Sequence, residues 1–384
     1  MRKTFKYRIY PTHMQERLLN ETLGECRWLY NQLLEQRKAA WDERQESLNL
    51  YDQHALFPAM KAARPTLKLV HSQVLQNVGV RIDLAMKAFF RRVKSGETPG
   101  YPRFRGADRY DSFTYPQAPS GCKLVGDRLH LTKIGSIRVV LHRPLEGTPK
   151  TVTVQRSSTG KWYVAFSCEW EPTPLPVLEK QVGIDVGLTF FATFSDGDAI
   201  ENPRFFRKEE QALATQSRRF QKIRDAEADQ RSRLYRKAKK RIARVHERVA
   251  WRRENFSHQE SRKVVNASQF IAVEDLSVNR MAHNHCLAKS IHDAAWSTFT
   301  SMLSYKAECA GRTYIAVNPA YTSQDCSNCG HRQKMSLSER IYTCACCKLV
   351  LNRDHNAALN ILRLGLQATG TQSREAARVI PSAE

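Results

Sequence analysis

The stretch QVGIDVGLTFFATFSDGDAI (181–200) has the pattern of two β-strands with a turn between them. Its first apolar run ends at Asp185, which lies between two glycines that are expected to let a ligand approach the backbone. Two more buried-type runs follow, FIAVEDL (270–276) and RTYIAVNPAY (312–321), and helical patterns separate all three. Strands that alternate with helices are typical of an α/β domain. We therefore predict an α/β fold with at least partly parallel strand pairing.

Acidic side chains stand where two of these strands end and where a late helix begins. Asp185 ends the first run, Glu274 and Asp275 end the second, and Asp354 opens the helix in CACCKLVLNRDHNAALNIL (344–362). Taken singly, each acid has an ordinary explanation, as a strand-end residue, a loop residue or a helix N-cap. Parallel strands bring their carboxyl ends to one edge of a sheet. We therefore expect these acids to converge.

Converging carboxylates repel one another by roughly several kcal/mol unless divalent cations lie between them. Two Mg²⁺ ions about 4 Å apart are the usual apparatus of phosphodiester hydrolysis, one polarising the attacking water and one steadying the leaving 3′ oxygen. An actin-like ATPase also begins with a GIDxG-type strand, but it needs further Gly-rich phosphate loops that this sequence lacks. The pattern favours a nuclease, and by itself it leaves the choice between Glu274 and Asp275 open.

Four of the ten cysteines form two CxxC pairs, Cys326 with Cys329 and Cys344 with Cys347, separated by fourteen residues. Each pair presents two thiolates from one tight turn, and two pairs complete a closed tetrahedral Zn²⁺ site. A closed site has no position for water, so we predict one structural zinc ion, with a redox pair as the alternative. Cys346 lies inside the second pair and is expected to be a bystander. This cysteine usage favours a reducing, cytoplasmic compartment.

Positive charge dominates the composition, with 61 Lys and Arg against 38 Asp and Glu and a formal net charge of +23. Residues 204–263 contain 20 bases and 8 acids, so this stretch alone supplies +12. Such a surplus favours a polyanionic partner, with nucleic acid expected and an anionic membrane as the weaker alternative. Since the chain has neither a long apolar run nor a hydrophobic signal core in residues 1–18, we expect a soluble protein without membrane association.

The N-terminal half combines strands and helices. KTFKYRIY (3–10) alternates like a strand, helical patterns follow up to Gly96, and residues 121–170 indicate four strands joined by Gly-containing turns. These strands are expected to close a small barrel, a common oligonucleotide-binding platform. GYPRFRGADRYDSFTYP (100–116) is expected to be a loop, and the proline-bearing EPTPLPVLEK (171–180) a linker between domains.

The chain resembles the TnpB (OrfB) proteins encoded by insertion sequences, which are compact relatives of type V CRISPR effectors. The resemblance runs over nearly the whole sequence. It is carried by YRIYPTHMQERLLNETLGECRWLYNQLL, GIDVGL, IAVEDL and TSQDCSNCG…ERIYTCACC…NRDHNAALNIL. The order acid, acid, zinc ribbon, acid is specific to this group.

The resemblance implies a RuvC-like RNase H fold with an Asp, Glu, Asp centre that binds two Mg²⁺ ions. These positions fall on Asp185, Glu274 and Asp354, which favours Glu274 over Asp275. An Arg that supports the centre in related nucleases is expected at Arg340. The ribbon ligands of the family fall on the four CxxC cysteines, which are Cys326, Cys329, Cys344 and Cys347.

Two positions depart from the family pattern. Asn352 stands where the family usually has an acid, in a DRD motif that reads NRD here, and Lys348 stands where a Gly is often found. Neither departure removes a member of the acid triad. We therefore expect the chain to be catalytically active.

The resemblance also implies a β-barrel wedge domain with an inserted helical recognition domain, followed by the nuclease domain with an inserted zinc ribbon. The expected ranges are 1–10 and 111–175 for the wedge domain, 11–110 for the recognition domain, 181–320 and 348–366 for the nuclease domain, and 321–347 for the ribbon. Residues 367–384 are expected to form a flexible tail.

The implied function is RNA-guided DNA cleavage. A guide RNA from the end of the transposable element would read the target double-stranded DNA by base pairing, while the protein reads a short flanking motif. We expect a monomer that carries out this reaction in the cytoplasm of a prokaryotic cell. Two alternatives remain, a non-cleaving DNA-binding regulator of transposition and a transposase that joins strands itself.

Overall fold

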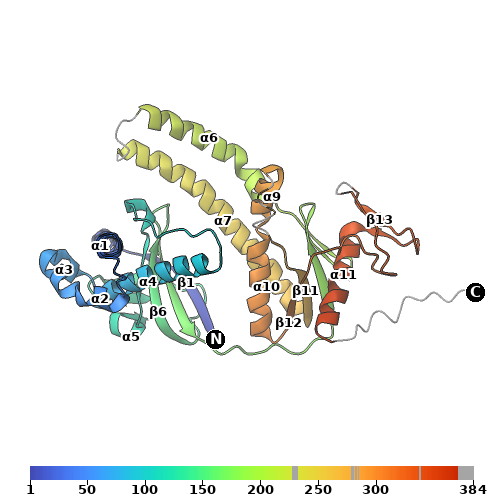
Figure 1. Cartoon of the computed structure of the whole chain (residues 1–384), viewed down its shortest axis with the longest axis horizontal. Helices are drawn as coiled ribbons and strands as arrows, with labels where there is room; N and C mark the ends of the chain where they lie inside the picture. Colours follow the sequence, from blue (N-terminus) through green and yellow to red (C-terminus); the bar gives the residue numbers. More distant parts are fainter. Residues whose placement is uncertain (227–231, 278–280, 282, 284, 337–338, 371–384) are drawn as a thin grey trace, which may run out of the picture. The chain divides into compact units, whose positions relative to one another are not determined.

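The chain forms two compact units, Met1–Glu171 and Pro172–Glu384 (Figure 1). The computed structural model describes residues 1–226, 232–277, 281, 283, 285–336 and 339–370. The division coincides with the start of residues 171–180, which contain neither helix nor strand. Across these described ranges, no helix has the length and apolarity needed to span a membrane.

The first unit is built on a seven-stranded antiparallel sheet with the strand order β2-β6-β7-β1-β5-β4-β3. The strands are β1 (Arg2–Tyr10), β2 (Ser112–Tyr115), β3 (Cys122–Val125), β4 (Arg128–Leu131), β5 (Gly135–Val140), β6 (Thr148–Arg156) and β7 (Trp162–Glu169). Strand β1 lies in the middle, paired with β7 on one side and β5 on the other, and β2 and β3 are the edges of a nearly closed, barrel-like sheet.

The four strands expected in residues 121–170 are present as β4 to β7. Strand β2, in contrast, was not expected. It lies in the stretch 100–116 that we expected to be a loop. Its four residues bury Phe113 and Tyr115 by pairing with β6. A run this short becomes a strand because of its tertiary partner, so periodicity alone does not reveal it.

The helices of the first unit are α1 (His13–Arg44), α2 (Leu50–Ala55), α3 (Phe57–Ala63), α4 (Ser72–Lys94) and the single turn α5 (Ala118–Gly121). Thr12 caps α1 with a capping box, in which its hydroxyl accepts from the N–H of Gln15 and its own N–H donates to the Gln15 side chain. The two reciprocal bonds satisfy backbone groups that the first turn leaves free.

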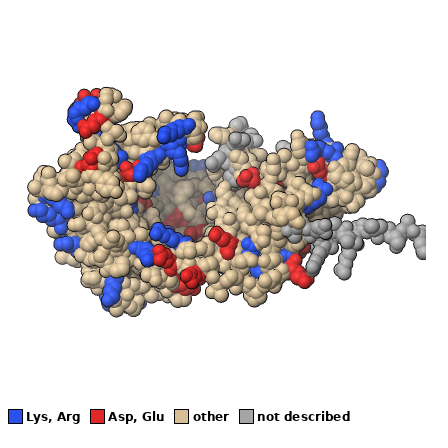
Figure 2. All heavy atoms as spheres, turned by 60° about the horizontal axis from the view of Figure 1, so that its bottom comes forward, with Lys and Arg blue, Asp and Glu red and all other residues tan. Residues whose placement is uncertain are grey.

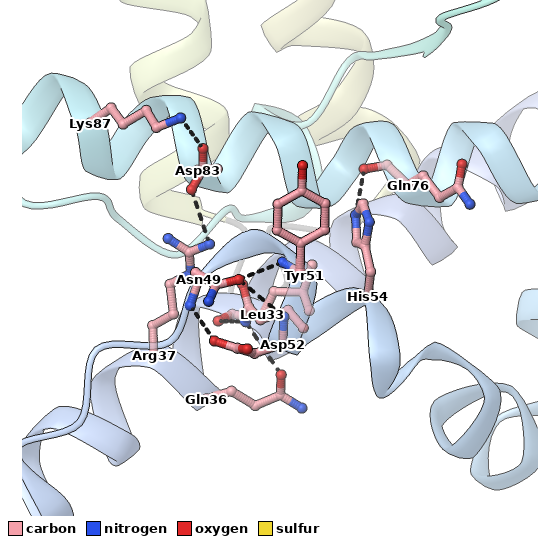
Figure 3. A network of polar contacts seen from close by, with 11 residues as sticks. Leu33, Gln36, Arg37, Asn49, Tyr51, Asp52, His54, Gln76, Asp83 and Lys87 are labelled. Atoms are coloured by element: carbon pink, nitrogen blue, oxygen red, sulfur yellow. Dashed lines mark hydrogen bonds and ion pairs between the residues drawn. The ribbon is translucent and has the colours of Figure 1, made fainter.

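A buried polar network joins α1, α2 and α4 (Figure 3). Arg37 of α1 donates through Nε to Oε1 of Gln53 at 2.7 Å, and its Nη2 lies 3.4 Å from Oδ1 of Asp83 on α4. Gln53 is fully buried and donates to the carbonyl oxygen of Leu33 at 2.7 Å. Because buried polar groups are costly without partners, these bonds hold both α2 and α4 against α1.

The second unit contains a five-stranded mixed sheet with the order β10-β9-β8-β11-β12. Its strands are β8 (Gln181–Val186), β9 (Phe190–Phe194), β10 (Ala199–Glu201), β11 (Phe270–Glu274) and β12 (Thr313–Val317). Strands β8, β9 and β10 pair antiparallel, and β11 pairs parallel to both β8 and β12. The expected α/β domain with partly parallel pairing is therefore confirmed.

Helices cover both faces of this sheet, as Figure 1 shows for α10 and α11 on opposite sides of β11 and β12. The helices are α6 (Phe205–Ala226), α7 (Arg233–Ala267), α9 (His285–Ala294), α10 (Trp296–Ala310) and α11 (Arg353–Ala368). One core joins the sheet to α7 and α10, and a second core joins it to α11. Helix α11 ends at Ala368, two residues beyond the expected end of the nuclease domain at 366, and residues 371–384 lie outside the described ranges.

Lys306 of α10 is a buried cation at the contact with α7. Its Nζ donates to the carbonyl oxygen of His258 and to Oγ of Ser261, both at 2.7 Å, and the residue is 3% exposed. Burial, with a smaller contribution from the charge of Arg262, lowers the pKa of Lys306 to about 8.

We expect this lysine to make the free energy of unfolding rise as the pH increases from about 8 to about 10. Over this interval the unfolded lysine keeps a proton that the folded one has lost, so the unfolded state binds more protons. The shift corresponds to at most about 3 kcal/mol. Lys306→Met should remove the rise, measured as the change in urea midpoint between about pH 7.5 and about pH 9.5. The exposed Lys263→Met is the matched control and should keep it, and a variant at Lys306 that responds like wild type would contradict this account.

Candidate metal centre and zinc ribbon

The predicted acids lie on the face of the sheet that α11 covers. On β8, Val182 and Ile184 pack with α7 and α10, while Gly183 meets the backbone of α11. Since side chains alternate along a strand, Asp185 shares the face of Gly183. On β11, Phe270 and Ala272 pack with α11, so Glu274 also belongs to that face.

Asp275 belongs to the opposite face by the same alternation. It is exposed, and its charge contributes to raising the pKa of Tyr314 on β12. Together with Glu274, Tyr314 and residues of α10 it lines a pocket of about 290 Å³. Of the two acids that the pattern of residues left open, the structure therefore brings Glu274 onto the face of Asp185.

The pairing register sets Glu274 next to Asp185. Ala272 pairs with Gly183 and Val273 with Ile184, so one further step along the two parallel strands brings the acids side by side. Burial raises the pKa of Asp185 well above its usual range, and the nearby charges of Glu274 and Asp354 raise it further. The positive charge of Arg353 acts in the opposite direction. The structure thus brings Asp185, Glu274 and Asp354 together.

Helix α11 carries Asp354 to this edge because it packs unusually close to β8. A Cβ atom on Gly183 would lie 2.1 Å from the carbonyl oxygen of Ala358, and no side-chain rotation relieves a clash with backbone. We expected the glycines beside Asp185 to admit a ligand. The structure shows instead that Gly183, which has no Cβ, allows α11 to pack closely against β8.

Asn352 caps α11 and so explains one departure from the family pattern. Its Oδ1 accepts from the N–H of Asp354 at 2.9 Å and of His355 at 3.4 Å. The cap that we considered for Asp354 is therefore supplied by Asn352. The carboxylate of Asp354, in the first turn, is left for the acidic cluster.

Glu274 has a partner that sequence reasoning missed. The hydroxyl of Thr322 donates to Oε1 of Glu274 at 2.5 Å. Burial raises the pKa of Glu274, and this hydrogen bond opposes the rise because it favours the charged carboxylate. Thr322 precedes the first cysteine pair by four residues, and no feature of composition or spacing marks it out.

Arg340 was expected near the centre, but its side chain is exposed. Its carbonyl oxygen accepts from the N–H of Arg353 at 2.8 Å. Arg353 is instead the cation whose charge reaches Asp185. Its guanidinium donates to the carbonyl oxygen of Ser336 at 2.7 Å. A supporting role for Arg340 stays a prediction.

The four predicted cysteines form one cluster between β12 and α11. The sulfur atoms of Cys326, Cys329, Cys344 and Cys347 all lie within 4.8 Å of one another. Sγ of Cys326 is 3.5 Å from that of Cys347, and Sγ of Cys329 is 3.6 Å from that of Cys344. A regular tetrahedron with Zn–S bonds of about 2.3 Å would space its sulfurs about 3.8 Å apart. The donor set and its spacing fit a tetrahedral zinc ion.

The cluster lies beside a small hairpin, and the structure explains two features of the sequence around its second cysteine pair, Cys346 and Lys348. Strands β13 (Ile341–Thr343) and β14 (Val350–Asn352) pair antiparallel beside it. Cys346 is exposed and outside the cluster, as expected of a bystander. Lys348 has φ 61°, a left-handed conformation that favours glycine. The Gly that the family often has at this position would fit the same turn without a Cβ.

The basic stretch 204–263 corresponds to α6 and α7, with residues 227–231 outside the described ranges. Glu209 of α6 is buried and pairs with Arg252 at 2.7 Å and Arg248 at 3.2 Å on α7, which ties the two helices together. Other Lys and Arg side chains lie on the surface of both units (Figure 2). These helices offer a positively charged surface for a polyanion.

Three family profiles match this chain. "Probable transposase" matches residues 165–285, "Cas12f1-like, TNB domain" matches 296–361 and "Helix-turn-helix domain" matches 1–46. In the last of these ranges the structure has strand β1 and the single long helix α1.

The chain is also similar to complete proteins and to a solved structure. It is 34% identical to "Putative RNA-guided DNA endonuclease" of Streptomyces pristinaespiralis, over 96% of this chain and 90% of that protein. It is 32% identical to "Putative RNA-guided DNA endonuclease InsQ" of Escherichia coli (strain K12), over 94% and 92%. The structure titled "Cryo-EM structure of the Cas12f1-sgRNA-target DNA complex" shares the fold, with a TM-score of 0.60 at 15% identity over 94% of this chain and 98% of that one.

Identity above 30% over nearly the full length of this chain and of each relative shows that they belong to one family. Of the residues that carried the resemblance, the acids meet on one face of the sheet, the cysteines form the cluster, and the N-terminal stretch forms β1 and α1. This chain belongs to the TnpB (OrfB) family of proteins encoded by insertion sequences.

Proposed function

We propose that this chain is an RNA-guided DNA endonuclease encoded by a transposable element, which cuts double-stranded DNA next to a short flanking motif. Its relatives of similar length carry that activity in their names. The observation that carries the proposal is the meeting of Asp185, Glu274 and Asp354, from three distant segments, on one face of the sheet.

The nuclease domain is proposed to have a RuvC-like RNase H fold. Three antiparallel strands followed by two strands parallel to the first, in the order β10-β9-β8-β11-β12, support this assignment. Helices on both faces support it as well. In such a sheet the functional side chains lie at the carboxyl ends of the parallel strands, where Asp185 and Glu274 are found.

The three acids are proposed to hold two Mg²⁺ ions. The raised pKa of Asp185, to which burial and the charges of Glu274 and Asp354 contribute, indicates negative charge that a cation would neutralise. Bound there, the ions would polarise the attacking water and stabilise the leaving 3′ oxygen.

The protein's own part is to hold the acids in place before substrate arrives. Gly183 admits α11 to the sheet, Asn352 starts the helix at Arg353, and Thr322 orients Glu274. The zinc ribbon, with Cys326, Cys329, Cys344 and Cys347 as ligands, is proposed to be structural because its four donors leave no open position.

The domain ranges are proposed as follows. The barrel-like sheet of residues 1–10 and 111–175 would be the wedge domain, and the helices of 11–110 the recognition domain. Residues 181–320 and 348–366 would be the nuclease domain, interrupted by the ribbon at 321–347. The basic helices α6 and α7 would neutralise the phosphates of guide RNA and target DNA.

Sequencing the RNA that co-purifies with the protein from its native locus tests the guided part of this proposal. We expect one discrete RNA from the end of the element, held at moderate salt and lost as salt rises because phosphate contacts dominate. Only heterogeneous cellular RNA, or none, would contradict guidance. Occupied DNA that stays uncut with Mg²⁺ present would favour a regulator of transposition, and covalently joined strands would favour a transposase.

A further inference from the structure

Thr322 connects the zinc ribbon to the acidic face of the sheet. It lies between β12 and the first cysteine pair and is 4% exposed. Its Oγ1 is 2.5 Å from Oε1 of Glu274 and 3.1 Å from the carbonyl oxygen of Pro319. A hydroxyl carries a single proton, so the shorter contact with the carboxylate is the one that receives it.

The backbone of the same segment is held by the helix that carries Asp354. Asn360 donates through Nδ2 to the carbonyl oxygens of Thr322 at 2.9 Å and Asp325 at 2.7 Å. One turn earlier, Asn356 donates to Asp325 at 2.8 Å and accepts from the N–H of Ser327 at 2.9 Å. Both asparagines are buried, with Asn356 0% exposed and Asn360 1% exposed.

The loop 322–327 is therefore fixed at three points. Its carbonyl oxygens are bonded to α11, its Cys326 belongs to the cysteine cluster, and its first hydroxyl touches Glu274. Glu274 sits at the end of a strand, with a side chain of three rotatable bonds that burial alone does not orient. The hydroxyl donates to one carboxylate oxygen and leaves the other available.

We propose that Thr322 is a positioning residue for Glu274, and that the zinc ribbon sets the orientation of Glu274 through Thr322. This inference rests on the proposed metal centre. Residues that orient a metal ligand by hydrogen-bonding to it typically lower the metal affinity about 10- to 100-fold when they are removed. The ribbon is then part of how the centre is assembled, beyond any contact it makes with nucleic acid.

The test uses Mn²⁺ alone as the probe, with free Mn²⁺ followed by electron paramagnetic resonance in the full-length protein bound to its RNA. Thr322→Val keeps the shape and removes the hydroxyl, and it should weaken Mn²⁺ binding about 10-fold or more. Thr322→Ser restores the hydroxyl and should stay within about threefold of wild type. Thr22→Val, which removes a buried hydroxyl that bonds to Leu18 within α1, is the matched control and should have no effect.

Mn²⁺ affinity of Thr322→Val equal to wild type would overturn the proposal. So would equal losses in the Val and Ser variants, or a loss of zinc from Thr322→Val, because either result makes Thr322 a structural residue of the ribbon. Asp185→Ala separates this failure from that of the metal centre. If Asp185→Ala loses Mn²⁺ while Thr322→Val does not, positioning fails alone, and if neither loses it, the centre itself fails.

A double-mutant cycle tests the route from the ribbon. Cys344→Ser should weaken Mn²⁺ binding in the wild-type background and add little in the Thr322→Val background, because both changes act on the same contact. If Cys344→Ser lowers the Mn²⁺ affinity by the same factor in both backgrounds, the ribbon does not act through Thr322.

Discussion

Asp185→Ala is expected to reduce DNA cleavage about 10³-fold or more while guide RNA binding stays near wild type. The carboxylate contributes to holding the ions that stabilise the transition state, and each 1.36 kcal/mol lost costs about tenfold in rate. RNA binding depends on the basic surfaces, which the substitution leaves intact. Plasmid cleavage rates and an RNA-binding titration at the same salt concentration measure the two effects.

The same substitution separates a catalytic acid from a structural one. Because the pKa of Asp185 is raised by burial and by two neighbouring acids, its ionised form opposes folding when no cation is present. The Ala variant should therefore unfold at an equal or higher temperature than wild type without Mg²⁺. Asp196→Asn, which breaks an exposed ion pair with Lys180, is the control and should retain cleavage. A lower unfolding temperature together with lost RNA binding would mean that Asp185 is structural.

Cys344→Ser is expected to release zinc and to reduce cleavage about 10²-fold or more, with a much smaller loss of RNA binding. Cys344 is fully buried in the cluster, and its loss leaves three thiolates for a tetrahedral ion. The ribbon is continuous with Thr322, so its collapse disturbs Glu274 through the contact between the two. Zinc content, cleavage rate and RNA affinity are measured on the same preparation.

Cys346→Ser supplies the matched control for this prediction. It lies two residues from Cys344, is exposed and stands outside the cluster, so the variant should keep zinc and cleave like wild type. If Cys344→Ser lost RNA binding and cleavage to the same extent, the ribbon would be supporting the whole fold, and its separate role in the centre would be wrong.

The sequence predicted the parts of the site that reside in single side chains of distinctive chemistry. Two CxxC pairs specify a cluster almost by themselves, and acids at strand ends indicate an edge where they meet. Family resemblance favoured Glu274 over Asp275. The structure gives a physical reason for that choice, since alternation along β11 puts Glu274 on the same face as Phe270 and Ala272, which pack with α11.

What the sequence did not reveal depends on contacts between distant segments. Gly183 was interpreted as room for a ligand, because only the packed helix shows that Ala358 fills that space. Asn352 looked like a departure from a motif, whereas in three dimensions it caps α11. Thr322 has no distinctive spacing at all, and its importance comes from the 2.5 Å contact with a residue 48 positions away.

Cleavage of paired plasmids by the purified protein and its RNA tests the central claim most directly. The two plasmids carry the same flanking motif and differ only in the segment that the guide can pair with. We predict a linear product from the matching plasmid alone, dependent on Mg²⁺, and a switch to the second plasmid when the guide is rewritten to match it. Cleavage of both plasmids regardless of the guide, or stable binding of the matching plasmid without any cut, would contradict the account.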